Sequence, residues 1–383
     1  MDRSDFRPGV SNRKPSVIIV ENSVGVTGAF KAIFNYAQFV SGEFDFVFVV
    51  PKGSKVISVI NAEGFKVVEL PFVEIGKSLK KLFLYLPYLI YNSIRLLRIA
   101  KRNKAYLVHV NDFYNLVGAM GKILGGNYKL LTHIRFMPDR FPALLVKIWY
   151  GLGVKYSSLV ICVSNAVKKC LPEHPKVKVI YDTIPAIINP PRIEKPQRND
   201  DLVHLLYLGH YIPGKGQDHA LEALSLAYQE NEHIRLRFVG GDMGMEKNKK
   251  YKEKLMARAK ELGLEKVVEF YGSSNNIKHE YNWANIALNF SESESFSFTC
   301  LEALAHGVPL IVTDSGGPAE LFEDGRSGLL VCNKDIKAMA DAILYLANDD
   351  KVRKSYASEG MHTVSHKFAL ENTFERLSRI YKQ

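Results

Sequence analysis

The chain has 383 residues, of which 47% are apolar and 24% charged, and its formal net charge is +11. This length exceeds one ordinary hydrophobic core and predicts two domains, and the composition excludes a disordered or fibrous protein. No apolar run reaches the about 18–20 residues that span a bilayer, and residues 1–16 lack the apolar core of a secretory signal, so a cytoplasmic protein is expected. The cysteines show neither close pairs nor metal-ligand spacing, which favours reduced thiols at Cys162, Cys170, Cys300 and Cys332.

The positive charge is concentrated in the first half of the chain. Residues 1–190 contain 26 basic and 12 acidic side chains, a net charge of +14, and the remainder contains 25 basic and 28 acidic ones, a net charge of −3. A basic half is typical of proteins that bind nucleic acid, anionic lipid or a phosphorylated substrate. The charge alone does not choose among these partners.

The first half opens with a strand, a turn and a helix. Residues 16–20 are an apolar run of strand length, and residues 29–40 have a helical pattern. The turn between them lacks the G-x-G-x-x-G fingerprint, so it is a weak candidate for a dinucleotide site. Thr27 is placed to cap the helix and leave N–H groups near Gly28 open to a phosphate, although a plain tight turn explains these residues equally well.

Apolar runs alternate with helical stretches through both halves of the chain. This alternation predicts an α/β protein with parallel sheets covered by helices on both faces, that is, doubly wound Rossmann-like domains. Ligands of such sheets bind beyond the carboxyl ends of the strands. The predicted strands are residues 16–20, 44–50, 66–70, 107–110, 129–133, 159–163, 177–181, 204–208, 234–239, 267–272, 286–290, 310–312 and 328–331.

Residues 77–104 combine basic ends with an aromatic and aliphatic middle at residues 82–94. Pro87 is expected to bend or break a helix here. Three interpretations stay open: a helix that packs on the core and has solvated basic ends, a surface that rests on anionic lipid, and a platform for single-stranded nucleic acid, which nothing else in the chain supports. The basic residues are Lys77, Lys80, Lys81, Arg95, Arg98, Lys101, Arg102 and Lys104.

Polar side chains follow two predicted strands of the first half. His109 and Asp112 come at the end of one strand, and His133 and Arg135 come at the end of the next, where ligand-contacting residues of such a sheet lie. A histidine in such a position is more often structural than catalytic, because it readily satisfies local hydrogen bonds.

Residues 182–201 contain four prolines and little periodicity, which predicts an interdomain linker. The chain is accordingly divided into a first domain at residues 1–190, a second domain at residues 200–362 and a C-terminal helical segment at residues 363–383.

Two loops of the second half carry the most specific pattern. Residues 209–216 follow a strand and place Lys215 just before a helix, a combination suited to a diphosphate. Glu294 and Glu302 flank the start of a helix predicted at residues 297–306, where free N–H groups favour an anion. Taken alone, these two carboxylates are more simply explained as solvated surface.

The two loops together resemble the donor site of retaining glycosyltransferases with the GT-B fold, the nucleotide-sugar family four. In that family two glutamates are separated by seven residues that include an aromatic residue and small ones, and Gly-x-Pro follows. Lys215-Gly216 matches the Lys-Gly of its diphosphate loop, whereas His210 stands where arginine is usual. The resemblance is strong over residues 205–331 and weaker before the linker. The other matching positions are Glu294, Phe296, Ser297, Glu302-Ala303 and Gly307-Val308-Pro309.

This resemblance implies transfer of a sugar from a UDP- or GDP-sugar to a glycan or lipid-linked acceptor, in cell-surface polysaccharide or lipopolysaccharide synthesis. It implies catalytic roles for His133, Lys215 and Glu294, no metal and no cofactor, and a last helix that crosses back to the first domain. Arg135 is favoured as the cation that compensates for His210, and His109 and Asp112 are expected to help hold the acceptor. The implied donor-binding residues are Gly28, Arg135, Gly209, His210, Lys215, Tyr271, Gly272, Glu294, Phe296, Ser297, Phe298 and Glu302.

The expected partners are the donor, the acceptor and, through residues 77–104, an anionic membrane surface, with the protein peripheral on the inner face of the cytoplasmic membrane; no nucleic acid is expected. Two rival functions were weighed. A nicotinamide dehydrogenase also uses doubly wound domains, but its glycine fingerprint and the acidic residue after the second strand are missing. A non-catalytic basic protein that binds membrane or nucleic acid explains the charge of the first half but not the two loops of the second.

Overall fold

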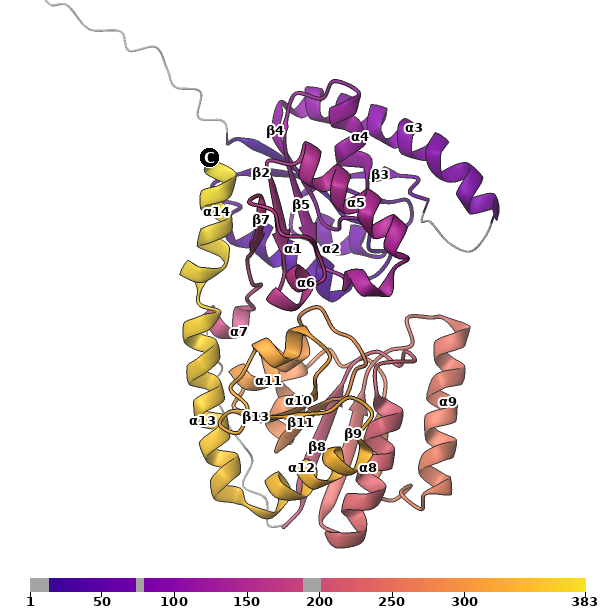
Figure 1. Ribbon diagram of the computed structural model, residues 1–383, viewed down its shortest axis with the longest axis vertical. Helices are drawn as coiled ribbons and strands as arrows, with labels where there is room; N and C mark the ends of the chain where they lie inside the picture. The colour runs from indigo at the N-terminus through magenta and orange to yellow at the C-terminus, as the bar shows by residue number, and fades with distance from the viewer. Residues whose placement is uncertain (1–13, 74–78, 189–200) are drawn as a thin grey trace, which may run out of the picture.

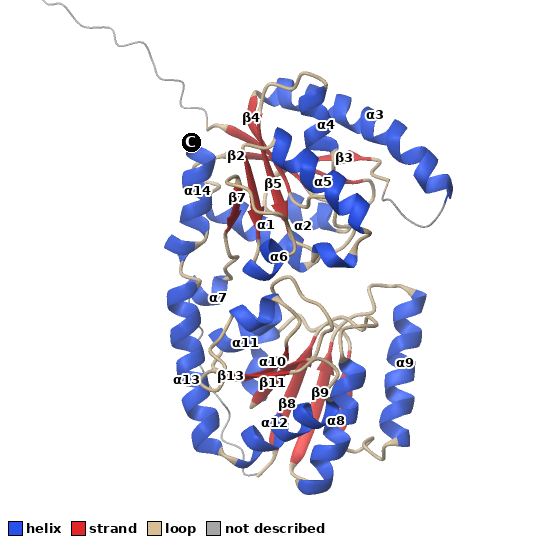
Figure 2. Ribbon diagram, in the orientation of Figure 1, coloured by secondary structure: helices blue, strands red, loops and turns tan. Residues whose placement is uncertain are grey.

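Two parallel sheets, each flanked by helices, make up the computed structural model, which describes residues 14–73, 79–188 and 201–383 (Figures 1 and 2). The first sheet has seven strands in the order β3-β2-β1-β4-β5-β6-β7, and the second has six in the order β10-β9-β8-β11-β12-β13. Because both faces of such a sheet are covered, its strands are continuous apolar runs rather than alternating ones, as in β1 (Ser16–Val20). The predicted α/β class and the two doubly wound sheets are confirmed.

The first sheet and its helices account for residues 14–179 of the described chain. Its elements after β1 are α1 (Gly28–Phe39), β2 (Asp45–Pro51), α2 (Val56–Ala62), β3 (Lys66–Leu70), α3 (Leu79–Asn103), β4 (Ala105–Val110), α4 (Val117–Ile123), β5 (Lys129–Ile134), a 3-10 turn (Pro138–Arg140), α5 (Ala143–Tyr156), β6 (Leu159–Cys162), α6 (Asn165–Lys169) and β7 (Val177–Val179).

The second sheet follows the short helix α7 (Pro185–Ile188). Its elements are β8 (Val203–Leu208), α8 (Gln217–Glu230), β9 (Ile234–Val239), α9 (Glu246–Glu261), β10 (Val268–Tyr271), α10 (Ile277–Trp283), β11 (Ile286–Asn289), α11 (Phe298–Ala305), β12 (Leu310–Thr313), the 3-10 turn η2 (Gly317–Glu320), β13 (Gly328–Val331), α12 (Ile336–Asn348) and α13 (Asp350–Lys367), and the chain ends with η3 (Leu370–Asn372) and α14 (Phe374–Lys382).

The strand orders predict one ligand crevice in each sheet, at the carboxyl ends of its central strands. The direction of winding reverses between β1 and β4 in the first sheet and between β8 and β11 in the second, and such switch points are where doubly wound sheets bind ligands. The loops beyond these edges touch each other. A Cβ on Gly28 would lie 3.3 Å from the Phe298 ring, and one on Gly316 would lie 3.4 Å from Ala166. The carboxyl ends of the two sheets therefore face one another.

The last helix, α14, packs on the first sheet's domain, so that α13 and α14 run along one side of the molecule (Figure 1). Tyr381 is fully buried there, with its ring centroid 5.1 Å from that of Tyr36 and 5.6 Å from that of Phe44. Its carbonyl accepts a hydrogen bond of 2.8 Å from the Tyr106 hydroxyl. The chain thus closes back on the domain in which it began.

Two expectations from the sequence are corrected. The predicted break at Pro87 is wrong: helix α3 continues through this residue, because that part of the helix surface is exposed and water can replace the backbone hydrogen bond that proline removes. The predicted linker begins in buried structure: Asp182, Thr183 and Ile184 are all below 7% exposed, and the Thr183 hydroxyl donates to the Phe368 carbonyl at 2.7 Å. The rest of that segment, residues 189–200, lies outside the described residues, as do residues 74–78.

Replacing Tyr381 with alanine tests the contribution of α14. Removing this buried ring should lower the free energy of unfolding by about 3–5 kcal/mol, because packing is lost and a cavity remains. Arg379→Ala, on the exposed side of the same helix, is the control and should change the free energy by less than about 0.5 kcal/mol. Urea unfolding of both variants gives the comparison, and equal values would contradict the role of α14.

Candidate active site

The loops that follow β8 and β11 are joined by hydrogen bonds at the switch point of the second sheet. The Tyr207 hydroxyl accepts from the Phe290 N–H at 2.7 Å and donates to the Lys215 carbonyl, and the Glu292 N–H donates to Gly214 at 2.9 Å. Gly216 has φ of +79°, and a Cβ there would lie 2.0 Å from the Phe290 carbonyl oxygen. Only glycine allows this approach, so it fixes where Lys215 lies.

Lys215 and Glu294 form an ion pair between Nζ and Oε1 at this junction. The Ser291 hydroxyl donates to the same carboxylate oxygen at 3.0 Å. The lysine side chain is 33% exposed and the glutamate side chain 16%, so both can be reached from solvent. The pair places one cation and one anion side by side in the crevice, where they can bind a phosphate and hydroxyl groups respectively.

The loop that follows β12 holds the backbone of the Glu294 loop in place. The Glu294 N–H donates to Ser315 at 2.9 Å, and its carbonyl accepts from the Gly317 N–H at 2.8 Å. A Cβ on Gly317 would lie 2.3 Å from the Ser295 carbonyl oxygen, and Gly316 has φ of +113°. Two consecutive glycines are therefore needed for these two loops to meet.

Helix α11 begins at the same junction. Its N-cap, Ser297, accepts from the Cys300 N–H at 3.4 Å and has φ of +81°, which is uncommon for a residue other than glycine. Asn289 donates to the Ser297 hydroxyl at 3.1 Å. The first residue of the helix, Phe298, lies against Gly28 at the start of α1. The N-terminal ends of two helices, one from each domain, therefore meet here, and both favour an anion.

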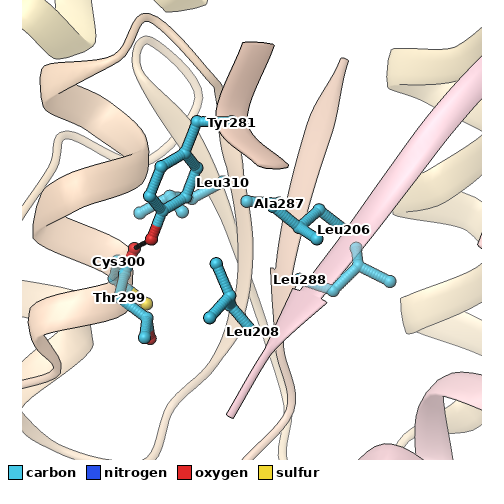
Figure 3. A pocket seen from close by; sticks show the side chains of 8 residues that line it. All are labelled: Leu206, Leu208, Tyr281, Ala287, Leu288, Thr299, Cys300 and Leu310. Carbon is cyan, nitrogen blue, oxygen red and sulfur yellow. Dashed lines mark hydrogen bonds between the residues drawn. The ribbon is translucent and has the colours of Figure 1, made fainter. Parts of the chain in front are cut away.

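Glu302 lies one turn into α11, and its carboxylate accepts from the Tyr281 hydroxyl at 3.3 Å. Burial raises the pKa of Glu302, while the charge of Lys31 and the hydrogen bond from Tyr281 lower it. Tyr281 also donates to the Thr299 carbonyl at 2.9 Å and lines a small, mainly apolar pocket beneath α11 (Figure 3). This pocket belongs to the packing of the helix, and the polar groups of the switch point lie outside it.

His210 lies in the loop after β8, where Nδ1 is 3.2 Å from the Gly241 carbonyl oxygen. Burial lowers the pKa of His210, and the nearby charges of Lys215 and Lys31 lower it further, against the effect of the Gly241 hydrogen bond. The ring is therefore neutral at pH 7. Since a carbonyl only accepts, Nδ1 carries the hydrogen, and Nε2 has a lone pair instead of a donor.

Other predicted donor-binding positions fall into two groups. Gly209 and Gly272 leave open space around Cα, and Tyr271 is 47% exposed with the Arg237 guanidinium 4.8 Å from its ring centroid. Phe296, by contrast, is buried between the domains, with its ring 6.2 Å from that of Tyr181. The structure thus leaves the backbone of residue 296, rather than its side chain, at the crevice.

Arg135 lies in the interior of the first domain. Its guanidinium pairs with Asp182 at 2.5 Å, donates to the Asn111 side chain at 2.5 Å and lies 3.2 Å from Nδ1 of His133. The side chain of Arg135 is 4% exposed. In this structure Arg135 is paired with Asp182, so it does not supply a positive charge to the crevice of the second sheet.

His133 and His109 belong to the same buried network. Their rings are stacked, with centroids 5.5 Å apart, and Nδ1 of His109 is 2.5 Å from the Tyr381 hydroxyl. Asp112 accepts from the Phe113 N–H at 2.8 Å. Burial lowers the pKa of His109 to about 3, lowers that of His133, and raises the pKa of Asp112 to about 8. His109, Asp112, His133 and Arg135 are thus brought together in the interior of the first domain, whereas Gly28, the fifth predicted residue of this domain, lies against Phe298 of the second.

Within the described residues, one polar atom of each of these three side chains has no hydrogen-bond partner: Nε2 of His109, Nε2 of His133 and Oδ2 of Asp112. Leaving a buried polar atom without a partner lowers the stability of the fold, so each of these atoms is suited to bind a water molecule or a substrate group. They lie where the strands β4 and β5 end, next to the switch point of the first sheet.

Glu320 joins the two domains, and the sequence reasoning did not assign it to a site. Its carboxylate accepts from the backbone N–H groups of Asn165 at 3.0 Å and Ala166 at 2.6 Å, and from the Tyr181 hydroxyl at 2.8 Å. A second-domain carboxylate therefore binds the first turn of α6 in the first domain, where a negative charge is favoured. Its place in the first turn after Gly317 was the available sequence signal, and that signal does not identify a partner in the other domain.

The second half of the chain is similar in sequence to known glycosyltransferases. Residues 190–362 match the family described as "Glycosyl transferases group 1". The alpha-1,3/1,6-mannosyltransferase ALG2 of Dictyostelium discoideum is 32% identical over 200 residues, which are 49% of this chain and 47% of that protein. The lipopolysaccharide core biosynthesis mannosyltransferase LpsB of Rhizobium meliloti (strain 1021) is 30% identical over 134 residues, 34% of this chain and 38% of that protein. The chain spans less than half the length of these curated relatives.

Solved structures resemble nearly the whole chain. Anabaena Alr3699/HepE in complex with UDP and glucose superposes with a TM-score of 0.78 and 20% identity, covering 96% of this chain and 99% of that one. Sucrose-phosphate synthase from Thermosynechococcus elongatus gives a TM-score of 0.76 and 19% identity, covering 97% and 99%. At this identity the likeness establishes the fold, which is shared across both domains.

Replacing Asp112 with asparagine tests the buried carboxyl. Its raised pKa means that the folded state holds a proton that the unfolded state has released, so its contribution to stability is complete below pH 3.8 and is lost as the pH rises to about 8. The stability of wild type relative to Asp112→Asn should therefore fall between pH 5 and 8, by up to about 1.4 kcal/mol per pH unit. Urea unfolding at several pH values measures this, with the exposed Asp341→Asn as control. A difference that does not change with pH would contradict the assignment.

Proposed function

We propose that this chain belongs to the glycosyl transferases of group 1, the family that residues 190–362 match, and that the whole chain is a GT-B glycosyltransferase. It moves a sugar, with retention of anomeric configuration, from a UDP- or GDP-sugar to a glycan or lipid-linked acceptor, in cell-surface polysaccharide or lipopolysaccharide synthesis. The observation that carries this proposal is the meeting of Lys215, Glu294 and the start of α11 at the β8/β11 switch point. The mannosyltransferase relatives and the structural neighbour that binds UDP and glucose support it.

In this proposal the nucleotide lies over the carboxyl ends of β8 to β11. Glu302 accepts hydrogen bonds from the ribose hydroxyls, since a carboxylate has more acceptor sites than the single bond from Tyr281 uses. The backbone at Tyr271 and Gly272 contacts the base, and the open space around Gly272 leaves room for it. Gly209 allows the nucleotide to approach the start of the β8 loop.

The diphosphate lies between Lys215 and the N–H groups at residues 296–298. Charge develops on the diphosphate as the sugar leaves, and a cation with fixed N–H donors stabilises that charge more strongly than it stabilises the bound substrate. This donor set needs neither metal nor cofactor. Glu294 accepts hydrogen bonds from the sugar hydroxyls, and Nε2 of His133, which has no partner among the described residues, is the first domain's contact with the sugar.

The proposed step takes place on one face of the sugar. The acceptor hydroxyl oxygen forms a bond to the anomeric carbon, while the bond from that carbon to the β-phosphate oxygen breaks. That phosphate oxygen takes the proton from the attacking hydroxyl, so the step needs no protein nucleophile and retains the configuration. On the first domain, His109 and Asp112 hold the acceptor side through the network at the ends of β4 and β5.

A membrane surface is the second part of the proposal and rests on α3. Helix α3 lies on the outside of the first domain (Figure 1). It packs on that domain through Leu89, Leu96 and Ile99, and its outer side carries exposed apolar residues followed by basic ones. Among the described residues this outer stripe is Phe83, Leu86, Ile90, Ile94, Arg98, Lys101 and Arg102. A helix with this pattern lies in the interface of an anionic bilayer, next to a lipid-linked acceptor. None of the described helices is both long and apolar enough to cross a bilayer.

Substitutions at the donor site test the reaction. Glu302→Gln should weaken binding of the nucleotide about 10–100-fold, because one partner of the ribose hydrogen bonds loses its charge. Lys215→Met and Glu294→Gln should each lower the transfer rate about 10²–10³-fold. A thermal-shift screen across UDP- and GDP-sugars first identifies the donor, since ligand binding raises stability by mass action. Calorimetry and a transfer assay then measure the variants.

The matched controls lie on exposed parts of the same domain. Glu323→Gln and Lys337→Met remove the same charges at exposed ion pairs and should leave binding and transfer unchanged. Activity like that of wild type in all three site variants would contradict the site. Salt-dependent binding to RNA or lipid, with no nucleotide-sugar binding, would favour the rival non-catalytic function.

Vesicle binding tests the outer stripe of α3. Removing the charges in Arg98→Gln/Arg102→Gln should weaken binding to vesicles that contain anionic lipid about 30-fold, since each basic residue contributes about 1 kcal/mol. Sedimentation with phosphatidylcholine vesicles, with and without phosphatidylglycerol, measures this. The control is Lys250→Gln/Lys254→Gln on α9, which removes two charges from the basic helix of the other domain. Equal losses in the two variants would show a general charge effect and contradict the docking surface.

A further inference from the structure

The first turn of α1 lies against the first turn of α11. A Cβ on Gly28 would be 3.3 Å from the Phe298 ring, so these helix ends are in van der Waals contact across the domains. Residues three or four apart share one face of a helix. Lys31 lies three residues after Gly28, and Glu302 lies four residues after Phe298. Each of them therefore lies one turn further along its helix, on the face that makes the contact.

Electrostatics place the Lys31 charge at the same junction. The positive charge of Lys31 lowers the pKa of Glu302 and also lowers the pKa of His210, although burial is the largest influence on both residues. One lysine of the first domain is therefore close to two predicted donor contacts of the second. Lys31 is exposed, and its side chain makes no hydrogen bond or ion pair with any other described residue.

Residue 210, where arginine is usual, brings no positive charge to the crevice of the second domain. His210 is neutral, and its Nδ1 donates to Gly241. The other ring nitrogen, Nε2, therefore presents a lone pair, which repels a phosphate oxygen. Arg135 is paired with Asp182 in the interior of the first domain. Lys215 is shared with Glu294. A diphosphate carries more negative charge than one shared lysine neutralises.

We propose that Lys31 binds the diphosphate of the donor from across the domain interface and supplies the positive charge that His210 does not. This inference rests on the proposed function and extends it: the anion is held by lysines of both domains, between the ends of α1 and α11. Nothing in α1 must move for this, since an exposed lysine reaches a phosphate by rotating its side chain.

Calorimetry with UDP, GDP and their nucleosides tests the role of Lys31. Lys31→Met should lower the affinity for the nucleoside diphosphate that binds wild type about tenfold or more and leave the affinity for the matching nucleoside unchanged. Lys31→Arg should keep the wild-type affinity. The control Lys66→Met, at an exposed lysine on β3, should have no effect. In Lys31→Met/His210→Arg the affinity should return, because an arginine at residue 210 supplies the charge from the other side.

The outcomes separate the two proposals. If wild type binds a nucleoside diphosphate and Lys31→Met binds it equally well, the role of Lys31 is overturned while the proposed function stands. An equal loss for the nucleoside would also overturn it, because the effect would not lie at the phosphates. If wild type binds neither UDP nor GDP nor any of their sugars, both proposals are overturned.

Discussion

The candidate site depends on the contact between two loop backbones at the edge of the second sheet. Gly317 approaches the carbonyl of Ser295 so closely that no side chain fits, and the Glu294 backbone is hydrogen-bonded on both sides to the loop after β12. Gly216 makes a similar approach on the other side, against Phe290. With both neighbours in contact, the β11 loop has little freedom, so the Glu294 carboxylate and the start of α11 keep fixed positions. Fixed donors and acceptors are what a charged transition state requires, because they need not reorganise as the charge develops.

Parallel strands explain why this site lies against the other domain. All strands of such a sheet end at one edge, so the connections that bear polar side chains collect there. Each domain has such an edge, and the two edges face one another. The first domain contributes a buried network of charged and aromatic groups around Arg135, and Tyr381 of the last helix completes it. The sheet of the first domain, its buried network and the C-terminal helix are thus joined by direct contacts.

Local patterns predicted most of the fold. The strands were found because a buried parallel strand is an uninterrupted apolar run, and the boundaries were correct within about two residues for β1, β3, β9 and β13. Thr27 caps α1, which is one of the two interpretations that the sequence left open, and this cap uses a bond between neighbours in the chain. The expected helix break at Pro87 was wrong, because the free-energy cost of proline in a helix depends on whether water reaches the freed carbonyl.

Long-range pairings were beyond the sequence. Arg135 was expected at the diphosphate, but its partner Asp182 lies 47 residues away, in a stretch that composition identified as linker. Lys31 was missed for the same reason, because its neighbours His210 and Glu302 belong to another domain. The motif around Glu294 was recognisable, since its spacing lies within one loop and one helix. What a pattern cannot give is which charges of distant segments cancel one another.

Glu320 connects the second domain with the first. The residue lies three positions after Gly317, inside the segment that contacts the Glu294 loop at the candidate site, yet its hydrogen bonds go to the backbone of Asn165 and Ala166 in the other domain. Loss of this carboxylate would remove hydrogen bonds between the domains without removing any of the proposed donor contacts. Under the proposed function, such a defect would leave nucleotide binding intact and displace the acceptor, so the donor would be hydrolysed rather than transferred.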